Sequence, residues 1–115
     1  MAKQRIKKVG ISASIEEVFP RFVASASARG VSDKTIQTYN EHIRCIGKHL
    51  DLSIPFSHLT QEDLDEMVVS MRMSGLAHNS IASYTRVFRT FLKWCRESGL
   101  TTLQLPHLED KEVGL

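Results

Sequence analysis

Hydrophobic residues recur every three or four positions along residues 75–99, which is the period of an amphipathic helix. This apolar stripe consists of Ile81, Tyr84, Phe88, Phe91, Leu92 and Cys95. The opposite face carries polar and cationic side chains, namely Asn79, Ser83, Arg86, Thr90 and Lys93, with Arg89 and Arg96 beside them. Glu97 is the only acidic residue in the stretch. A helix of this kind is suited to pack on a core with one side and to face a polyanion with the other.

Similar stripes predict three further helices, at about residues 14–29, 33–50 and 60–75. Their inward-facing residues are expected to be Ile15, Val18, Phe19, Phe22 and Val23 in the first helix, Ile36, Tyr39, Ile43, Ile46 and Leu50 in the second, and Leu64, Met67, Val68, Met71 and Met73 in the third. Phe56, in the connection at residues 51–59, is expected to tuck under the bundle. The chain is therefore predicted to be all-α, a small bundle of four (possibly five) helices arranged as two helical hairpins.

Local signals predict where these helices begin and end. Ser14 and Glu17 have the spacing of a capping box, and Ser32 is a natural N-cap. Gly30 is expected to stop the first helix. Pro20 lacks an N–H group and crowds the preceding turn, so it predicts either a kink or a helix that starts near this residue.

A weak internal duplication relates the two hairpins. A shift of 45 positions places residues 30–39 over residues 75–84, with matching glycine, isoleucine and tyrosine residues. The same shift aligns Arg44 with Arg89 and Lys48 with Lys93 without a gap. The second and fourth helices are therefore expected to be equivalent.

Composition narrows the class of protein. The chain has 115 residues, 42% of them hydrophobic, which is enough for the core of one domain. Its net charge is only +2, so any nucleic-acid binding must come from local patches. Two cysteines and no signal-peptide pattern favour a reducing, intracellular setting. No apolar run approaches the roughly 20 residues that cross a bilayer.

The ends of the chain differ from its middle. Residues 1–13 form a basic arm with Lys3, Arg5, Lys7 and Lys8, and residues 1–11 contain no acid. This arm is either a solvated terminus or a segment that touches phosphate. Residues 14–100 are expected to form the helical domain, and residues 101–115 an exit segment.

Other chemistry is weakly represented. His42, Cys45 and His49 share a helix face at metal-ligand spacing, but no fourth ligand is visible and Cys45 suits a small buried position, so no metal or other cofactor is expected. Trp94 could stack on a base, although its place beside the apolar stripe favours packing. No catalytic Ser/His/Asp set or glycine-rich phosphate loop is present.

An ordered set of short motifs resembles the core-binding domain of phage-integrase-type tyrosine recombinases. These motifs are Arg29-Gly30-Val31-Ser32, Thr35-Ile36, Tyr39, Leu59-Thr60, Asp63-Leu64, Asn79-Ser80-Ile81, Tyr84, Phe88-Arg89, Phe91, Trp94 and Ser98-Gly99. The resemblance covers about residues 14–100. It implies a SAM-like bundle of four or five helices that forms one half of a clamp around a recombination site and carries no catalytic residue.

The resemblance also implies that the second and fourth helices approach the major groove of DNA. Lys34 and Thr38 match family positions that commonly face DNA, and Asn79, Ser83 and Arg86 are looser equivalents. With the polar and cationic residues beside them, the candidate DNA-binding set is Lys34, Thr35, Thr38, Arg44, Lys48, Asn79, Ser80, Ser83, Arg86, Arg89 and Lys93. Such side chains bond phosphates and base edges.

The family's strand cleavage needs a tyrosine nucleophile together with arginines and histidines. Tyr39 and Tyr84 are the only tyrosines here, and neither has the family's nucleophile context. Family members usually continue into an Asn-Pro pair after the helical domain, whereas residues 103–106 read Leu-Gln-Leu-Pro. This chain alone is therefore not expected to be an enzyme but to be a fragment of one, or a free-standing binding module.

These observations lead to one main hypothesis and one rival. The main hypothesis is a DNA-binding module of a cytoplasmic recombinase, encoded by a bacterium, archaeon or phage. Its partners would be double-stranded DNA and, at full length on DNA, other recombinase protomers. The rival is a helical protein–protein interaction module, which would expose an apolar patch where a DNA module gathers cations.

Overall fold

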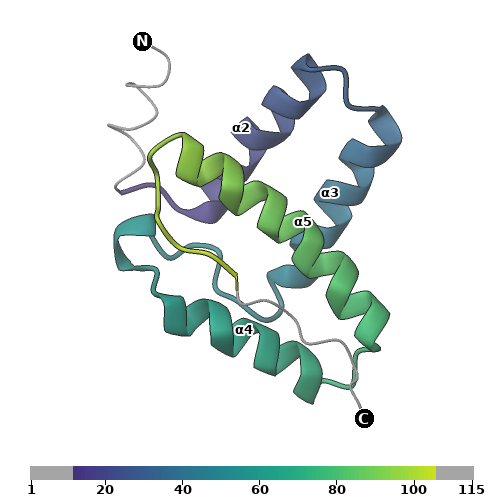
Figure 1. Cartoon of the computed structure of the whole chain (residues 1–115), viewed down its shortest axis with the longest axis vertical. Helices are drawn as coiled ribbons and strands as arrows, with labels where there is room; N and C mark the ends of the chain where they lie inside the picture. The colour runs from purple at the N-terminus through teal and green to yellow at the C-terminus, as the bar shows by residue number, and fades with distance from the viewer. Residues whose placement is uncertain (1–11, 106–115) are drawn as a thin grey trace.

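A computed structural model describes residues 12–105 of the chain. In this range the chain forms four α-helices, α2 (Ile15–Ala28), α3 (Asp33–Ile46), α4 (Gln61–Met73) and α5 (His78–Glu97), and a short 3₁₀ turn, η1 (Phe56–His58) (Figure 1). The predicted all-α bundle is confirmed. No helix of the described residues is long and apolar enough to cross a membrane.

Side-chain caps define where three of the helices begin. At α2, the Ser14 N–H donates to Glu17 Oε1 at 2.9 Å, and the Glu17 N–H donates to Ser14 Oγ at 3.4 Å. Thr60 and Asp63 form the same capping box at α4. Ser32 Oγ accepts from the N–H of Thr35 at 3.2 Å at the start of α3. The predicted caps at Ser14 and Ser32 are therefore confirmed, and each satisfies a backbone donor that the helix leaves unpaired.

Pro20 lies inside α2 without ending it. The alternative in which the helix starts near this residue is therefore wrong. The capping box begins the helix at Ile15, and Pro20 removes only the bond that its own N–H would make to the Glu16 carbonyl. Glu16 is held from outside the helix as well, because its N–H donates to the Leu52 carbonyl at 3.0 Å.

Glycines in the left-handed conformation end α2, α4 and α5, with φ of +91° at Gly30, +87° at Gly75 and +80° at Gly99. After α2, the Val31 N–H bonds the Ala26 carbonyl at 3.1 Å, which completes a Schellman motif. The predicted stop at Gly30 is confirmed. The second helix ends earlier than predicted, at Ile46 rather than near residue 50, and turns follow it.

The helix boundaries follow the 45-residue shift seen in the sequence. Asp33 and His78, which begin α3 and α5, are separated by this interval, and so are Ala28 and Met73, which end α2 and α4. The two hairpins, α2–α3 and α4–α5, therefore repeat one plan. They differ in detail, because Ala77 precedes α5 without a side-chain cap.

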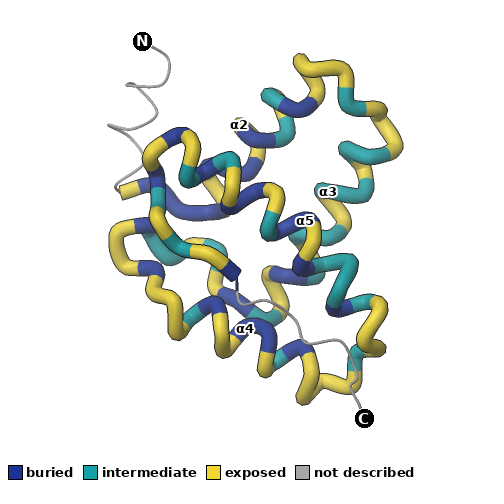
Figure 2. Tube along the Cα trace, viewed as in Figure 1, coloured by how far each residue is buried: buried dark blue, intermediate teal, exposed yellow. Residues whose placement is uncertain are grey.

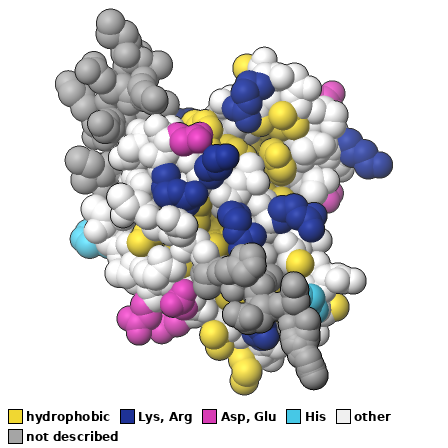
Figure 3. All heavy atoms as spheres, in the orientation of Figure 1, with side chains coloured by type: hydrophobic (Ala, Val, Ile, Leu, Met, Phe, Trp, Pro, Cys, Tyr) yellow, Lys and Arg dark blue, Asp and Glu magenta, His cyan; other side chains and the backbone are white. Residues whose placement is uncertain are grey.

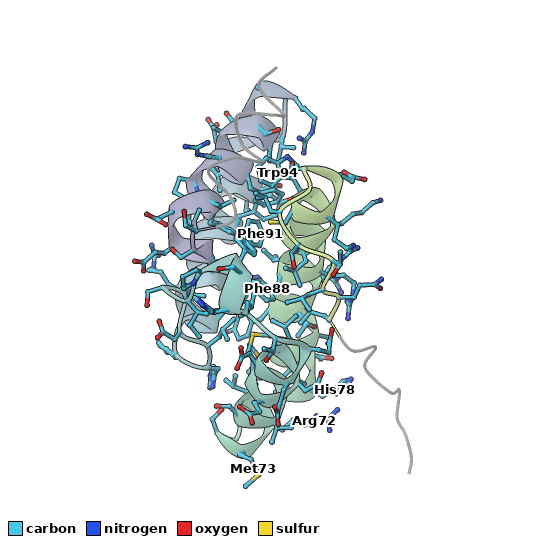
Figure 4. All side chains as sticks on the ribbon, turned by 90° about the vertical axis from the view of Figure 1, so that its left-hand side faces the viewer. Arg72, Met73, His78, Phe88, Phe91 and Trp94 are labelled. Carbon is cyan, nitrogen blue, oxygen red and sulfur yellow. The ribbon has the colours of Figure 1, made fainter. Side chains whose placement is uncertain are left out.

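The core lies between the hairpins, and α5 contacts each of the other three α-helices (Figure 2). Its centre is aromatic: Phe91 lies 5.0 Å from Phe19 and 5.4 Å from Phe22, measured between ring centroids. Figure 4 shows Phe88, Phe91 and Trp94 between the helices. Phe56 is buried as predicted. Aromatic packing at these distances adds to the stabilisation from apolar burial.

Met73 corrects the prediction for the third helix. Leu64, Met67, Val68 and Met71 are buried as expected. Met73 is 82% exposed and lies at the tip of α4, pointing away from the molecule (Figure 4). It falls two positions after Met71, so it lies about 200° around the helix from that buried residue.

The residues that follow α5 return across the bundle. Leu100 and Leu105 are buried, Arg96 Nη1 donates to the Leu103 carbonyl at 2.9 Å, and Gln61 Nε2 donates to the Gln104 carbonyl at 2.7 Å. The first part of the predicted exit segment thus packs on the helical domain. The rest of that segment and the basic arm lie outside the described residues, except for the arm's last two positions.

Candidate nucleic-acid interface

The outward face of α5 presents one polar stripe. Asn79, Arg86, Thr90 and Lys93 are exposed, and Ser83 is half-buried among them. Their spacing of three or four residues places them one above another on the helix surface. Figure 3 shows lysine and arginine side chains gathered over α5. This stripe therefore offers two cations and three uncharged polar groups to a partner that lies along the helix.

The outward face of α3 is also basic but more mixed. Lys34, Arg44 and Lys48 are exposed, and Lys48 lies in the turn just after the helix. Glu41 shares this face and accepts a hydrogen bond from Gln37 at 3.5 Å. The carboxylate lowers the net charge of this face to the level of the α5 stripe, so the stripe of α5 differs from α3 in having no acid rather than in having more cations.

The hydroxyl residues of the candidate set are half-buried rather than fully exposed. Thr35, Thr38, Ser80 and Ser83 all have intermediate burial. Thr35 Oγ1 accepts from Ser32 Oγ at 3.0 Å, and Thr38 Oγ1 donates to the Lys34 carbonyl at 3.2 Å. The hydroxyls of Thr35 and Thr38 are thus already engaged in local hydrogen bonds, and each keeps acceptor capacity.

A ring contact joins α3 and α5. The rings of His42 and Tyr84 meet edge to face with centroids 4.9 Å apart. Cys45 lies beside the same tyrosine, and its hydrogen bond and charge raise the pKa of the Tyr84 phenol, with burial adding to the effect. Tyr84 therefore belongs to the contact between α3 and α5.

The other tyrosine also packs against the core. The ring centroid of Tyr39 lies 5.4 Å from that of Phe22. The ring centroid of Trp94 lies 5.8 Å from that of Phe22. This position agrees with the expectation that Trp94 packs on the core rather than stacking on a base.

The three residues with metal-ligand spacing are engaged separately. His42 packs on Tyr84, whereas His49 Nδ1 is hydrogen-bonded to Ser70 Oγ of α4 at 2.8 Å. Across residues 12–105, no group of three or more His, Cys, Asp or Glu side chains is placed to hold a metal ion. His42 and His49 therefore take part in the contacts of α3 with α5 and of the following turn with α4.

Not every cation on α5 belongs to the outward stripe. Arg89 is half-buried on the flank of the helix. Arg96 is half-buried too and holds the returning segment through the Leu103 carbonyl. Conversely, Thr90 and Gln37 are exposed on the two outward faces but were not in the candidate set. Their helical spacing from Arg86 and Lys34 is the signal that could have included them.

Acidic side chains gather elsewhere. Glu62, Asp65 and Glu66 are exposed on α4, and Figure 3 shows an acidic cluster set apart from the cations over α5. The acidic residues also favour the start of α4 through the helix dipole. The acidic cluster of α4 therefore lies apart from the polar stripe of α5, which is the more suitable of the two for a polyanion.

Comparison with known families places this arrangement in a class of domains. Residues 21–99 match the family described as phage integrase, N-terminal SAM-like domain. The match covers more than half of the chain, so the chain belongs to this family and has a recombinase-related role that involves DNA in general. No curated protein and no solved structure gives a significant match to the chain.

Proposed function

We propose that this domain grips the double-stranded DNA of a recombination site through the outward faces of α3 and α5, as part of a site-specific tyrosine recombinase. A separate C-terminal domain would perform strand cleavage, and other protomers would join at full length on DNA. The observation that carries the proposal is the outward stripe of α5 from Asn79 to Lys93, which contains two cations and no acid.

The chemistry of the two faces suits a duplex. The major groove, about 12 Å wide, admits an α-helix. Lys34, Arg44 and Lys48 of α3 would neutralise phosphates, and Arg86 and Lys93 of α5 would contact phosphates or guanine acceptors. The polar groups between these cations would bond phosphate oxygens or base edges: Thr35, Thr38, Asn79, Ser80 and Ser83. Arg89 would contribute from the flank.

The rival function, a protein-interaction module, would need an apolar patch on α3 and α5. In the described part of the chain, the large hydrophobic residues that are strongly exposed are Val69 and Met73, and both belong to α4. The outward stripe of α5 is instead polar along its length. This placement of apolar and charged groups favours DNA over a protein partner at the α3–α5 surface.

Alanine substitutions test the proposal. Lys34→Ala and Arg86→Ala should each weaken binding to duplex DNA about tenfold, because a lost phosphate or base contact costs on the order of 1–3 kcal/mol. Both side chains are exposed, so the melting temperature should not change. Arg72→Ala is the matched control, since it removes an exposed cation from α4 and should leave affinity unchanged. Equal affinity for wild type and both variants contradicts the proposed surface.

A further inference from the structure

An uncharged and an acidic side chain interrupt the cations on the outward face of α3. Lys34, Gln37, Glu41 and Arg44 are all exposed and follow one another at steps of three or four residues. This spacing places them on one side of the helix, and we call them the α3 stripe. The helix packs against α2 and α5, and all four side chains lie outside the core. The stripe therefore presents Gln37 and Glu41 with a cation at either end.

The two middle residues of the α3 stripe are joined to each other. Gln37 Nε2 donates to Glu41 Oε2 at 3.5 Å, which is a long hydrogen bond on an exposed surface. The two residues are one helical turn apart, a spacing at which side chains on a helix interact. An ionised carboxylate only accepts hydrogen bonds, so the amide turns its nitrogen toward Glu41. The carboxylate keeps acceptor capacity for a donor outside the helix.

The position of this pair fits the interior of a major groove. Lys34 and Arg44 are ten residues apart, which separates them by about 15 Å along the helix. The major groove is about 12 Å wide. A helix that enters the groove at an angle therefore brings the cations at its two ends near phosphates, while Gln37 and Glu41 face the base edges. Because a carboxylate repels phosphate, the DNA group that suits Glu41 is a donor on a base edge.

We propose that Glu41 is a specificity-determining residue that accepts a hydrogen bond from the N4 amino group of a cytosine, with Gln37 as its positioning residue. This inference rests on the proposed function, because it needs α3 to face DNA. In the major groove cytosine presents an amino donor, whereas guanine and thymine present acceptors. Adenine sets the N7 acceptor beside its amino group. The carboxylate of Glu41 therefore favours cytosine over the other three bases.

The same carboxylate should weaken binding to DNA in general. Its charge repels nearby phosphates, and this repulsion acts on every sequence. The hydrogen bond to cytosine, in contrast, is gained at one base pair only. Removal of the charge should therefore tighten binding to mixed sequences and abolish the preference at one position. A glutamate that is merely solvated, or that only stabilises the helix through Gln37, would produce no such loss of preference.

A selection from a pool of randomised DNA duplexes measures both effects on the whole chain. Wild type and Glu41→Gln are each incubated with the pool at low salt, and the bound duplexes are sequenced. We expect wild type to enrich cytosine at one position, and Glu41→Gln to lose this enrichment while the rest of the selected motif persists. In a duplex that carries the motif, exchange of that cytosine for thymine should weaken binding of wild type about tenfold and binding of Glu41→Gln little.

The positioning role of Gln37 is tested in the same selection. Gln37→Ala leaves the carboxylate in place but removes the amide that holds it. The preference for cytosine should therefore fall part of the way toward that of Glu41→Gln. A purely structural role of Gln37 would alter the melting temperature and leave the base preference as it is in wild type.

Glu66→Gln is the matched control, since it removes an exposed carboxylate from α4 and should leave the selected motif unchanged. An identical motif and an identical cytosine-to-thymine penalty in wild type and Glu41→Gln overturn the inference, while the proposed function stands. Binding of the pool by wild type without enrichment of cytosine at any position has the same consequence. A wild type that binds no duplex at low salt overturns the inference and the proposed function together.

Discussion

At the residue scale, equal charges on one helix have different roles. Arg86 and Arg96 both lie on α5, but Arg86 is exposed, whereas the guanidinium of Arg96 bonds the Leu103 carbonyl. The pattern of polar residues along the chain marks both as cations outside the core. The two roles can be told apart only once the position of the segment after Gly99 is known. That position depends on contacts between residues that are far apart in the sequence.

Cys95 provides a prediction about a buried thiol. The residue is 0% exposed, and burial raises the pKa of its thiol, with neighbouring Arg96 opposing the effect. Since the thiolate is the reactive form, Cys95 should resist alkylation in the folded protein at neutral pH. Half-buried Cys45 should react sooner. Mass spectrometry after timed alkylation checks this order, and faster labelling of Cys95 than of Cys45 would contradict the packing of α5.

The raised pKa of the Cys95 thiol also predicts how the stability of the protein depends on pH. In the unfolded chain the Cys95 thiol ionises near its ordinary pKa of 9.0, whereas in the folded protein its pKa is higher. The folded state therefore retains a proton that the unfolded state loses. The contribution of this thiol to stability is complete below pH 9 and declines as pH rises above it. Denaturant titrations at several pH values give the free energy of unfolding of wild type and of Cys95→Ala. Above pH 9 this free energy should fall more steeply with pH in wild type than in Cys95→Ala.

At the element scale, the sequence predicts helix ends best where a chemical signal marks them. Ser14 with Glu17 and Gly30 all act as expected, because a cap or a left-handed glycine is a local feature. The end of α3 is predicted late because Leu50 remains buried after the helix has ended at Ile46. An apolar residue in the following turn continues the periodic pattern without continuing the helix.

The candidate site shows a similar limit. Spacing identifies which residues lie outside the core, so Lys34 and Arg86 are found in exposed positions. Helical spacing does not distinguish a side chain that points fully outward from one on the flank of the helix. Thr35 and Ser80 are half-buried, and the presence of Glu41 on the α3 face weakens its positive charge. The half-burial depends on how α3 and α5 pack together, which the sequence alone does not define. The place of Glu41 on the α3 face, in contrast, follows from its helical spacing from Lys34.

Substitutions at Gly30 test whether the end of α2 depends on a residue in the left-handed conformation. Its φ is +91°, and a Cβ atom built there would meet nothing within 4 Å, so the cost of a side chain is backbone strain alone. Gly30→Ala should lower the free energy of unfolding by about 1 kcal/mol. Gly30→Asn should cost less, because asparagine tolerates this conformation better. Urea denaturation measures both, and an unchanged stability in Gly30→Ala would contradict the Schellman stop.

At the scale of the whole molecule, α5 connects stability with the proposed function. Its inner side supplies Phe88 and Phe91 to the core, and its outer side presents Arg86 and Lys93. The helix is held by contacts with α2, α3 and α4, so its polar stripe is carried on a rigid support. An acidic cluster, Glu62, Asp65 and Glu66, lies on α4, and the polar stripe of α5 from Asn79 to Lys93 contains no acid.

The central claim is that the α3–α5 surface binds DNA through its cations, and a binding titration tests it most directly. Affinity for a mixed-sequence duplex should be measured at several salt concentrations. Five exposed cations belong to the proposed surface: Lys34, Arg44, Lys48, Arg86 and Lys93. If all contact phosphate, the log–log slope of affinity against salt should approach about −4.5, at about −0.9 per contact, and Lys34→Ala should reduce it by about one contact. Absence of binding at low salt, or a slope near zero, would contradict the account.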